Sequence, residues 1–519
     1  MLRATSPLLL IVLLVAGCGG GGGAADADPA SAVPRDALLY LEAAVRPEGD
    51  TREHALAAAG KVLRTPDPEA KIRELLHRAL ADDAGDVDYD RDIGPWLGER
   101  AGLWVSDRLD ENEEPGVAAA VAATDLDAAE SAIEDSRRRN GESATERSHA
   151  GVEYRVDADG FAYAFAEDFV LFGDEPELKR TIDALEGEAL DSDQRYRDAI
   201  EGLSDDRLAH FFIDTKGFFA FVAQTDPESA EGLRQLQGLI PFDRLPPAAG
   251  AFLADGDRLA IDLSTTIPWG DLRRRLGAVA WGTGTTPLLR ELPGDSWGAQ
   301  GAPRFGETMR VLFDQLAGAF GGAVVEEQLR SELGLDLEQD VFSWVGDIAL
   351  FIRGESVDAL DGGVVIQVTD EDRAADAFGK IVGALRARGQ LDAQPLRLEG
   401  AETAFAVAAG GAPRPIVFAR GDGKVVVTYG EEAAVAALDP GETLGDSELF
   451  SRAESVLGDD LEPSMLLSIP PVVALVDSSG SADPSWDQAK PYIEAFDVIA
   501  IGGGTDGARS RGRVAAGLR

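Results

Sequence analysis

The sequence predicts an α+β fold of two homologous tandem units, each a largely antiparallel sheet with packed helices. Three observations support this prediction. A motif recurs 248 positions later in the chain, first at Asp88 and then at Asp336. Short apolar or alternating runs are separated by turn residues, a pattern typical of hairpins. The chain has 519 residues, of which 45% are hydrophobic and 27% charged, a composition and length that allow two or three folded domains.

The N-terminus has the pattern of an exported lipoprotein. Residues 7–16 form an almost unbroken apolar run that follows Arg3 and is too short to cross a bilayer as a helix. The run ends in Val15-Ala16-Gly17-Cys18, and Cys18 is the only cysteine of the chain. A thiol is nucleophilic enough to accept a lipid. We therefore expect residues 1–17 to be a signal peptide and Cys18 to be lipidated; the alternative is an ordinary secretory signal with an incidental cysteine.

The remaining chain divides by composition and by the repeat. Residues 18–33 begin with a run of glycines and continue with Ala, Asp, Pro and Ser, which predicts a flexible tether. The first repeat unit is expected over residues 34–267, a connector over 268–284 and the second unit over 285–519. No later run of 18 apolar residues exists, so we expect no second membrane span.

The repeated motif combines carboxylates, a tryptophan and a glycine. Its paired positions are Asp88 and Asp336, Asp92 and Asp340, Trp96 and Trp344, Gly98 and Gly346, and Glu99 and Asp347. The Asp86–Asp92 cluster could hold a cation, but Arg91 stands where a calcium loop needs glycine, so we favour a turn-making role. Each tryptophan is expected to anchor a helix to the sheet, with a carbohydrate-stacking platform as the alternative.

The expected strands and helices follow from periodicity. In the first unit the strands are predicted at 37–43, 101–105, 117–122, 161–166, 169–172, 208–213 and 259–263. In the second unit they are predicted at 348–352, 364–368, 404–407, 416–419, 425–428, 465–469 and 498–501. Helical spacing predicts helices over 72–80, 126–138, 309–320 and 371–387, with Asp125 and Asp370 as caps of the second and fourth.

No residue pattern predicts a cofactor, a metal site or a catalytic centre. The four histidines, His54, His77, His149 and His210, are scattered and have no counterparts in the second unit. Because 93 acidic residues outnumber 48 basic ones, the net charge is −45, and the phosphates of a nucleic acid would be repelled.

The chain resembles a known family in three features. These are the segment Val15–Cys18, the duplicated acidic and aromatic motif, and the closing pattern from Pro491 to Ile499 with Gly502 to Gly507 before a last strand. Together they resemble uncharacterised lipoproteins of high-GC Gram-positive bacteria, domain of unknown function 3352. The resemblance implies a protein held at the outer face of the cell membrane. It implies no activity, cofactor or catalytic residue.

The sequence thus predicts a membrane-anchored lipoprotein of the cell envelope, and we favour a non-catalytic binding or structural module over an enzyme. Its partners would be the membrane, through the lipid on Cys18, and an envelope protein, a wall polymer or a lipid; a passive scaffold is a further form of this hypothesis. The alternative is an envelope hydrolase, which needs two carboxylates about 5–10 Å apart, at least one with a raised pKa.

Overall fold

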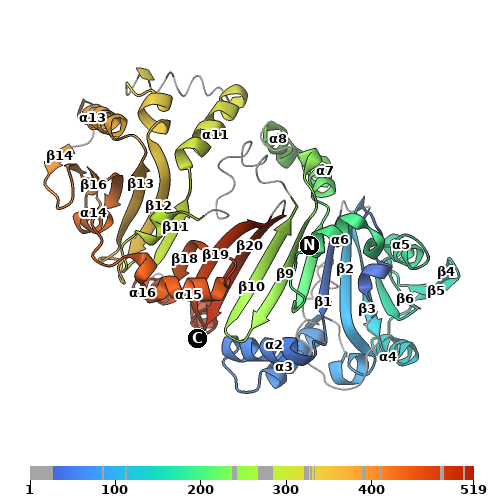
Figure 1. The fold of residues 1–519 in the computed structure, drawn as a ribbon. Coiled ribbons are helices and arrows are strands. Elements are labelled where there is room, and N and C mark those ends of the chain that lie inside the picture. Colours follow the sequence, from blue (N-terminus) through green and yellow to red (C-terminus); the bar gives the residue numbers. More distant parts are fainter. Residues whose placement is uncertain are drawn as a thin grey trace. The chain divides into compact units, whose positions relative to one another are not determined.

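The computed structural model describes two compact units (Figure 1). The described residues are 27–83, 87–110, 114–236, 242–266, 285–320, 327, 330–331, 334–387, 393–408, 411–479, 484–506 and 509–519. Unit 1 runs to Leu233 and includes Phe242–Thr266, and unit 2 holds Ile267–Arg519 with Arg234–Pro241. The predicted signal peptide, Cys18 and the connector 268–284 lie outside the described residues.

Unit 1 is built on an antiparallel sheet with the order β4-β5-β6-β7-β3-β2-β1-β8-β9-β10. Its strands are β1 (Leu39–Ala44), β2 (Leu97–Leu109), β3 (Pro115–Ala123), β4 (Thr145–His149), β5 (Val152–Val156), β6 (Phe161–Ala166), β7 (Phe169–Asp174), β8 (Ala209–Ile213), β9 (Ala248–Asp255) and β10 (Arg258–Thr265).

Unit 2 repeats this order strand for strand, as β14-β15-β16-β17-β13-β12-β11-β18-β19-β20, and every pairing is again antiparallel. Its strands are β11 (Gly298–Ala302), β12 (Val345–Arg353), β13 (Asp361–Val368), β14 (Ala393–Leu396), β15 (Thr403–Val407), β16 (Ile416–Gly421), β17 (Lys424–Tyr429), β18 (Pro463–Ser468), β19 (Phe496–Asp506) and β20 (Arg509–Leu518). The predicted antiparallel α+β class is confirmed.

Helices follow the strands in the same places in both units. Those up to Leu236 are α2 (Gly49–Val62), α3 (Pro68–Asp83), α4 (Leu126–Arg139), α5 (Glu175–Glu186), α6 (Gln194–Ile200), α7 (Thr215–Thr225) and α8 (Pro227–Leu236). Those of unit 2 are α10 (Pro287–Arg290), α11 (Phe305–Phe320), α13 (Glu371–Ala387), α14 (Glu431–Leu438), α15 (Glu448–Leu457), α16 (Ile469–Ser479) and α17 (Pro484–Ile493). The carboxylates of Asp125 and Asp370 accept backbone N–H bonds at the starts of α4 and α13, as predicted.

Each strand predicted with bounds lies at least partly within a strand of the structure, and the last strand expected after Asp506-Gly507 is β20. Five strands of the described residues were not predicted, namely β4, β5, β9, β11 and β14. Strand β11 is Gly-Ala-Gln-Gly-Ala and carries no local strand signal. It becomes extended because it pairs with β12 and β18, which is a tertiary effect that propensity does not report.

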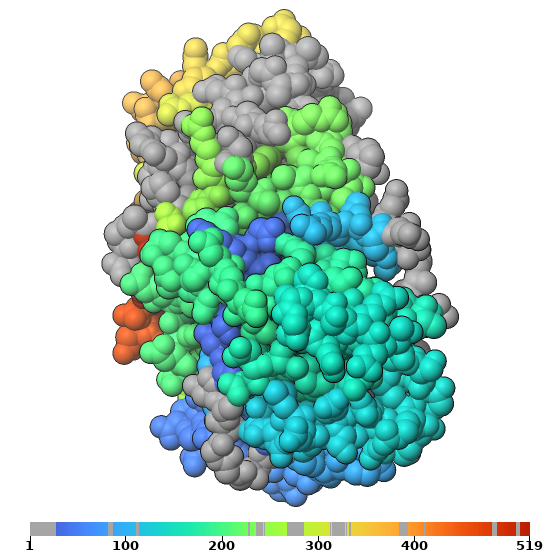
Figure 2. All heavy atoms as spheres, turned by 90° about the vertical axis from the view of Figure 1, so that its right-hand side faces the viewer, coloured from blue at the N-terminus to red at the C-terminus, as the bar shows by residue number. Residues whose placement is uncertain are grey.

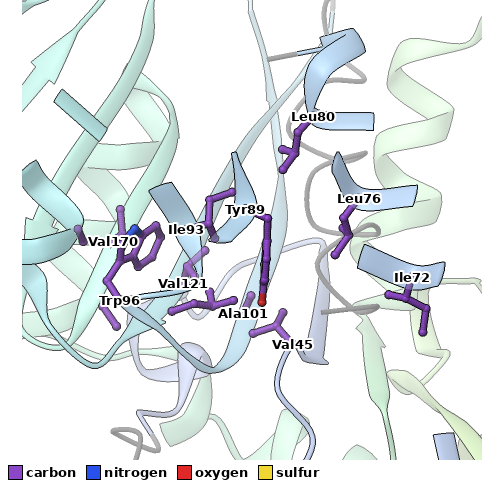
Figure 3. Close-up of a cluster of buried hydrophobic side chains, with 13 residues drawn as sticks. Val45, Ile72, Leu76, Leu80, Tyr89, Ile93, Trp96, Ala101, Val121 and Val170 are labelled. Atoms are coloured by element: carbon purple, nitrogen blue, oxygen red, sulfur yellow. The ribbon is translucent and has the colours of Figure 1, made fainter. Parts of the chain in front are cut away.

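The core of unit 1 includes a cluster of apolar side chains between the sheet and helices α2 and α3. Trp96, Tyr89 and Ile93 lie in it beside Val121 and Val170, and Leu76 and Leu80 reach it from α3 (Figure 3). Trp96 therefore connects the helical layer to the sheet.

The segment before β1 is part of the core of unit 1. Pro29–Ala32 forms a 3-10 turn, η1, and Ala30, Ala32 and Val33 are completely buried. The space-filling view shows the first described residues, in dark blue, between green and teal segments of the same unit (Figure 2). The tether predicted over residues 18–33 therefore extends too far along the chain. Residues 27–33 have the composition of a tether, but they pack against the sheet. We call residues 27–33 the strap.

Among the described residues, no helix has both the length and the apolar character needed to cross a membrane.

Candidate functional site

The repeated motif makes the same contacts in both units. In unit 1 the backbone N–H of Asp88 donates to the carboxylate of Asp92 at 2.9 Å, and the indole N–H of Trp96 donates to the Asp92 carbonyl at 2.6 Å. In unit 2 the corresponding bonds, from Asp336 to Asp340 and from Trp344 to Asp340, measure 2.8 and 2.7 Å. In each unit the motif thus forms a closed turn before β2 or β12.

Trp96 and Trp344 are core anchors. Their exposed fractions are 4% and 5%, so neither ring offers a face on which a sugar could stack. Gly98 and Gly346 allow a close approach to the neighbouring strand, because a Cβ at Gly98 would lie 2.7 Å from the carbonyl oxygen of Ala122. The Glu99 backbone carbonyl accepts a bond from Arg46, and the Asp347 carboxylate accepts one from the backbone of Arg304.

The buried aspartates of the motif form ion pairs with arginine and lysine side chains of the protein. Asp92 accepts from Arg91 and from Arg139 of α4 at 2.6–2.8 Å, and Asp340 accepts from Lys380 of α13 at 2.6 Å. Burial opposes ionisation of Asp92, but these bonds and that from Asp88 outweigh it and lower its pKa to about 2. Within the described part of the chain, no group of three acidic, histidine or cysteine side chains could hold a metal.

A second polar group, which the sequence did not predict, lies inside unit 1. We call it the polar cluster. Its buried members are Tyr40 and Glu42 of β1, Tyr196 of α6 and His210 of β8, all at most 6% exposed. The Tyr40 hydroxyl donates to the Glu42 carboxylate at 2.7 Å, and the Tyr196 hydroxyl lies 2.8 Å from His210 Nε2.

The protonation of His210 follows from its two neighbours. Arg207 Nε lies 3.4 Å from His210 Nδ1, and a guanidinium can only donate. We therefore assign the lone pair to Nδ1 and the proton to Nε2, which donates to the Tyr196 oxygen. Burial and the charge of Arg207 lower the pKa of His210 to about 3, so the ring is neutral at pH 7.

The strap closes the cluster on its outer side. Arg100 of β2 lies 3.4 Å from the Glu42 carboxylate and 3.8 Å from that of Asp28, at the start of the strap. Burial raises the pKa of Asp28, and the nearby Glu42 charge adds to this effect. A Cβ at Gly102 would lie 2.7 Å from Pro29 and 2.9 Å from Tyr40, so only glycine fits beneath the strap.

The corresponding positions of unit 2 are apolar or small. Strand pairing aligns the units here, since Tyr40 stands between Trp104 and Phe212 just as Ala299 stands between Phe351 and Leu466. In this alignment Gly301 replaces Glu42, Phe450 replaces Tyr196 and Ser464 replaces His210. The same sheet therefore forms without the polar cluster, and the fold alone does not require it.

The segment that covers this part of the sheet differs between the units. In unit 1 Ala30 of the strap lies in one buried cluster with the large Tyr40, whereas in unit 2 Leu289 of α10 lies next to Gly301. Thr286 lies against Gly301, as Pro29 lies against Gly102. A strap of small residues covers unit 1, and a short helix with two buried leucines takes its place in unit 2.

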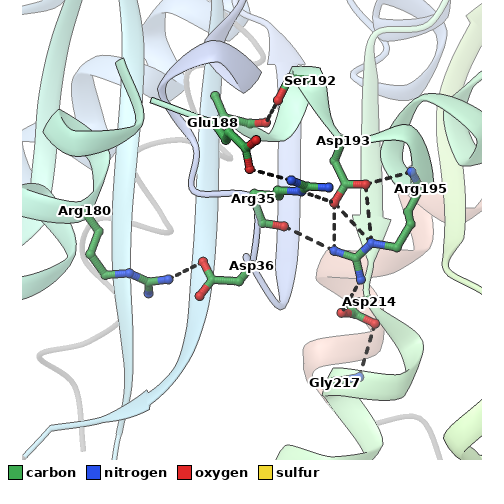
Figure 4. A network of polar contacts seen from close by, with 10 residues as sticks. Arg35, Asp36, Arg180, Glu188, Ser192, Asp193, Arg195, Asp214 and Gly217 are labelled. Carbon is green, nitrogen blue, oxygen red and sulfur yellow. Dashed lines mark hydrogen bonds and ion pairs between the residues drawn. The ribbon is translucent and has the colours of Figure 1, made fainter. Parts of the chain in front are cut away.

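A network of charged side chains fixes the loop that follows the strap. Asp193 is buried and accepts from Arg195 at 2.8 Å, and Arg195 also bonds Asp214 at 3.1 Å and the carbonyl of Arg35 at 3.4 Å (Figure 4). Burial of Asp193 opposes its ionisation, but the bonds from Arg195 outweigh it and lower the pKa. The loop before β1 is thereby joined to α6 and to the start of α7.

The comparisons with known proteins decide the family. The family described as a protein of unknown function (DUF3352) matches residues 9–241 and 321–460, more than half of the chain. The chain belongs to the DUF3352 family. No curated protein matches it.

Solved structures add little to this assignment. Crystal forms I and III of TP0453 are each 14% identical to this DUF3352 protein, with a TM-score of 0.24. They cover 49% and 46% of this chain and 87% and 80% of TP0453. A likeness at this level supports no conclusion about function.

Sequence reasoning could have found the polar cluster through the repeat. Tyr196 aligns with Phe450, and the second half of this DUF3352 chain contains no histidine. Where one unit has a polar residue and the aligned position of the other unit has an apolar one, the shared fold does not determine the residue type. The four histidines were instead set aside because their spacing matched no metal or catalytic pattern.

Proposed function

We propose that this DUF3352 protein is a lipid-anchored, non-catalytic module of the cell envelope that binds another envelope component through unit 1. The observation that carries the proposal is the lone Cys18 directly after an apolar run and two small residues. Location at the outer face of the membrane follows from this pattern. Because unit 2 lacks the polar cluster, we favour unit 1 as the unit that binds this component.

We also infer that the two units arose by duplication. The support is the shared strand order, the motif repeated at a spacing of 248 residues and the matching hydrogen bonds of Asp92 with Trp96 and of Asp340 with Trp344. After a duplication, one copy can keep the fold while the other acquires new polar groups. The cluster around His210 fits this division of roles.

Acylation of the cysteine tests the anchor. Cells are fed an alkyne-bearing fatty acid, and wild type is compared with Cys18→Ala and with the matched control Gly19→Ala, which keeps the thiol. Wild type and Gly19→Ala should take up the lipid and sediment with membranes, and Cys18→Ala should do neither. Equal membrane attachment of Cys18→Ala would overturn the proposal.

One observation favours the alternative, an envelope hydrolase. Asp28 and Glu42 both lie within 4 Å of the same Arg100 nitrogen, and the pKa of Asp28 is raised. Glu42, however, is buried beneath the strap and bonded to Tyr40. Turnover of wall glycans by the mature protein that is lost in Glu42→Gln, but kept in the exposed control Glu188→Gln, would establish the alternative.

A further inference from the structure

Helix α7 is an apolar helix that fully buries none of its side chains. Phe218 is 39% exposed, and the other large apolar residues are half-buried: Phe219, Phe221 and Val222. In unit 2 the helix in the same place, α16, follows β18 directly and buries Ile469 and Val473. Val472, Leu475 and Val476 of α16 are half-buried as well, but no large apolar side chain of α16 is exposed as Phe218 is, so the exposed aromatic residue is specific to unit 1.

The charge of α7 also differs from that of the chain. Thr215–Thr225 contains no carboxylate and one lysine, Lys216, although the net charge of the chain is −45. Asp214, which caps the helix, is paired with Arg195. The next acidic residue is Asp226. The helix thus offers a surface that anionic lipid headgroups do not repel, and aromatic side chains favour the interface between headgroups and hydrocarbon.

The segment that follows the anchor is joined to the start of this helix. Nine residues lead from Cys18 to Ala27 and can span at most about 30 Å. The strap then enters unit 1 and continues to Leu38, whose carbonyl accepts a bond from the backbone of Asp214 at 3.0 Å. Arg195 bonds both Asp214 and the carbonyl of Arg35, so the loop from the strap and the start of α7 are held together (Figure 4).

We propose that α7 rests on the outer leaflet of the membrane that anchors the chain, with Phe218 inserted at headgroup level. The proposal depends on the lipid anchor of the proposed function. The lipid on Cys18 holds the chain at the bilayer but does not orient the folded unit, and α7 supplies a second contact that does. Unit 1 is then held in one orientation on the bilayer.

The single cysteine of the chain makes this proposal testable by spin labelling. In the acylated protein the thiol of Cys18 is blocked, so Phe218→Cys introduces the only free thiol. The matched control is Asp255→Cys, an exposed position in the same unit. Strand β9 begins beside Ile213, next to α7, and Asp255 lies about 23 Å further along it. The acylated variants carry a nitroxide label and are reconstituted into phosphatidylcholine–phosphatidylglycerol vesicles.

Two relaxing agents report the position of each label, because oxygen concentrates in the bilayer and a nickel chelate stays in water. At residue 218 the ratio of oxygen to nickel accessibility should exceed that at residue 255 several-fold. If the two positions gave equal ratios while the wild-type protein took up no label, the docking of α7 would be overturned but the lipid anchor would not. A wild type that takes label at Cys18 would show that the anchor itself is absent. Unchanged thermal unfolding of each variant confirms that it is folded.

Discussion

Units 1 and 2 build the same antiparallel sheet, yet they cover it differently. In unit 1 Ala30 of the strap shares a buried cluster with the large Tyr40, and in unit 2 Leu289 of α10 lies next to Gly301, which replaces Glu42. The motif with Trp96 or Trp344 is unchanged between them. The comparison separates residues that the fold requires, which recur, from those that it tolerates, which differ.

The largest effect is expected from the tryptophans of the motif, which both units share. Trp96→Ala and Trp344→Ala each remove a buried indole and its hydrogen bond to the preceding turn, and each should cost about 3–5 kcal/mol in the unit that carries it. Denaturant unfolding followed by hydrogen exchange measures this loss unit by unit. A cost below about 1 kcal/mol in either unit would show that the tryptophan is not a core anchor.

The next effect should appear in unit 1 alone. His210 has a pKa of about 3 in the folded protein and near 6.5 when unfolded, so the unfolded state binds more protons between these values. Stability is present above pH 6.5 and is lost as the pH falls toward 3, by about 3 kcal/mol between pH 7 and pH 4.

Unfolding of unit 1 at a series of pH values measures this loss, and His210→Phe should flatten the profile. Unit 2, in which Ser464 occupies this position, is the internal control. A nuclear magnetic resonance titration that placed the pKa of His210 above 6 would contradict the buried neutral ring.

The sequence predicted the parts of this structure that depend on local pattern. Every predicted strand lies at least partly within an observed one, the caps Asp125 and Asp370 accept the expected bonds, and the repeat marked equivalent positions. The strap could not be predicted, because residues 27–33 have the composition of a tether, and their burial depends on distant residues such as Gly102, which leaves room for Pro29. The polar cluster was predictable only in part: the repeat marks Tyr196 and His210 as positions where the two copies differ, but the contact between them forms only when α6 folds onto β8.

A smaller effect should distinguish the strap of unit 1 from α10 of unit 2. Ala30→Leu adds volume above the large Tyr40 and should destabilise unit 1 by about 1–3 kcal/mol through overpacking. Leu289→Ala in unit 2 should instead leave a cavity next to Gly301. The double variant Ala30→Leu with Tyr40→Ala should recover part of the stability lost on overpacking, measured as a coupling energy in denaturant unfolding. Strict additivity would show that the strap and Tyr40 do not share one volume.

The smallest effect should be equal in both units. Asp125→Ala and Asp370→Ala each remove a helix cap of equivalent geometry, at α4 and α13. Each should cost about 1 kcal/mol of stability, detected as a shift of the unfolding midpoint. Unequal costs would indicate that the two helices start differently in solution.

Intact mass spectrometry of the protein from its own membranes tests the anchor most directly. The account predicts a chain that begins at Cys18 and carries a diacylglyceryl group on the sulfur. A mature chain with a free thiol at Cys18, or one that retains residues 1–17, would contradict it.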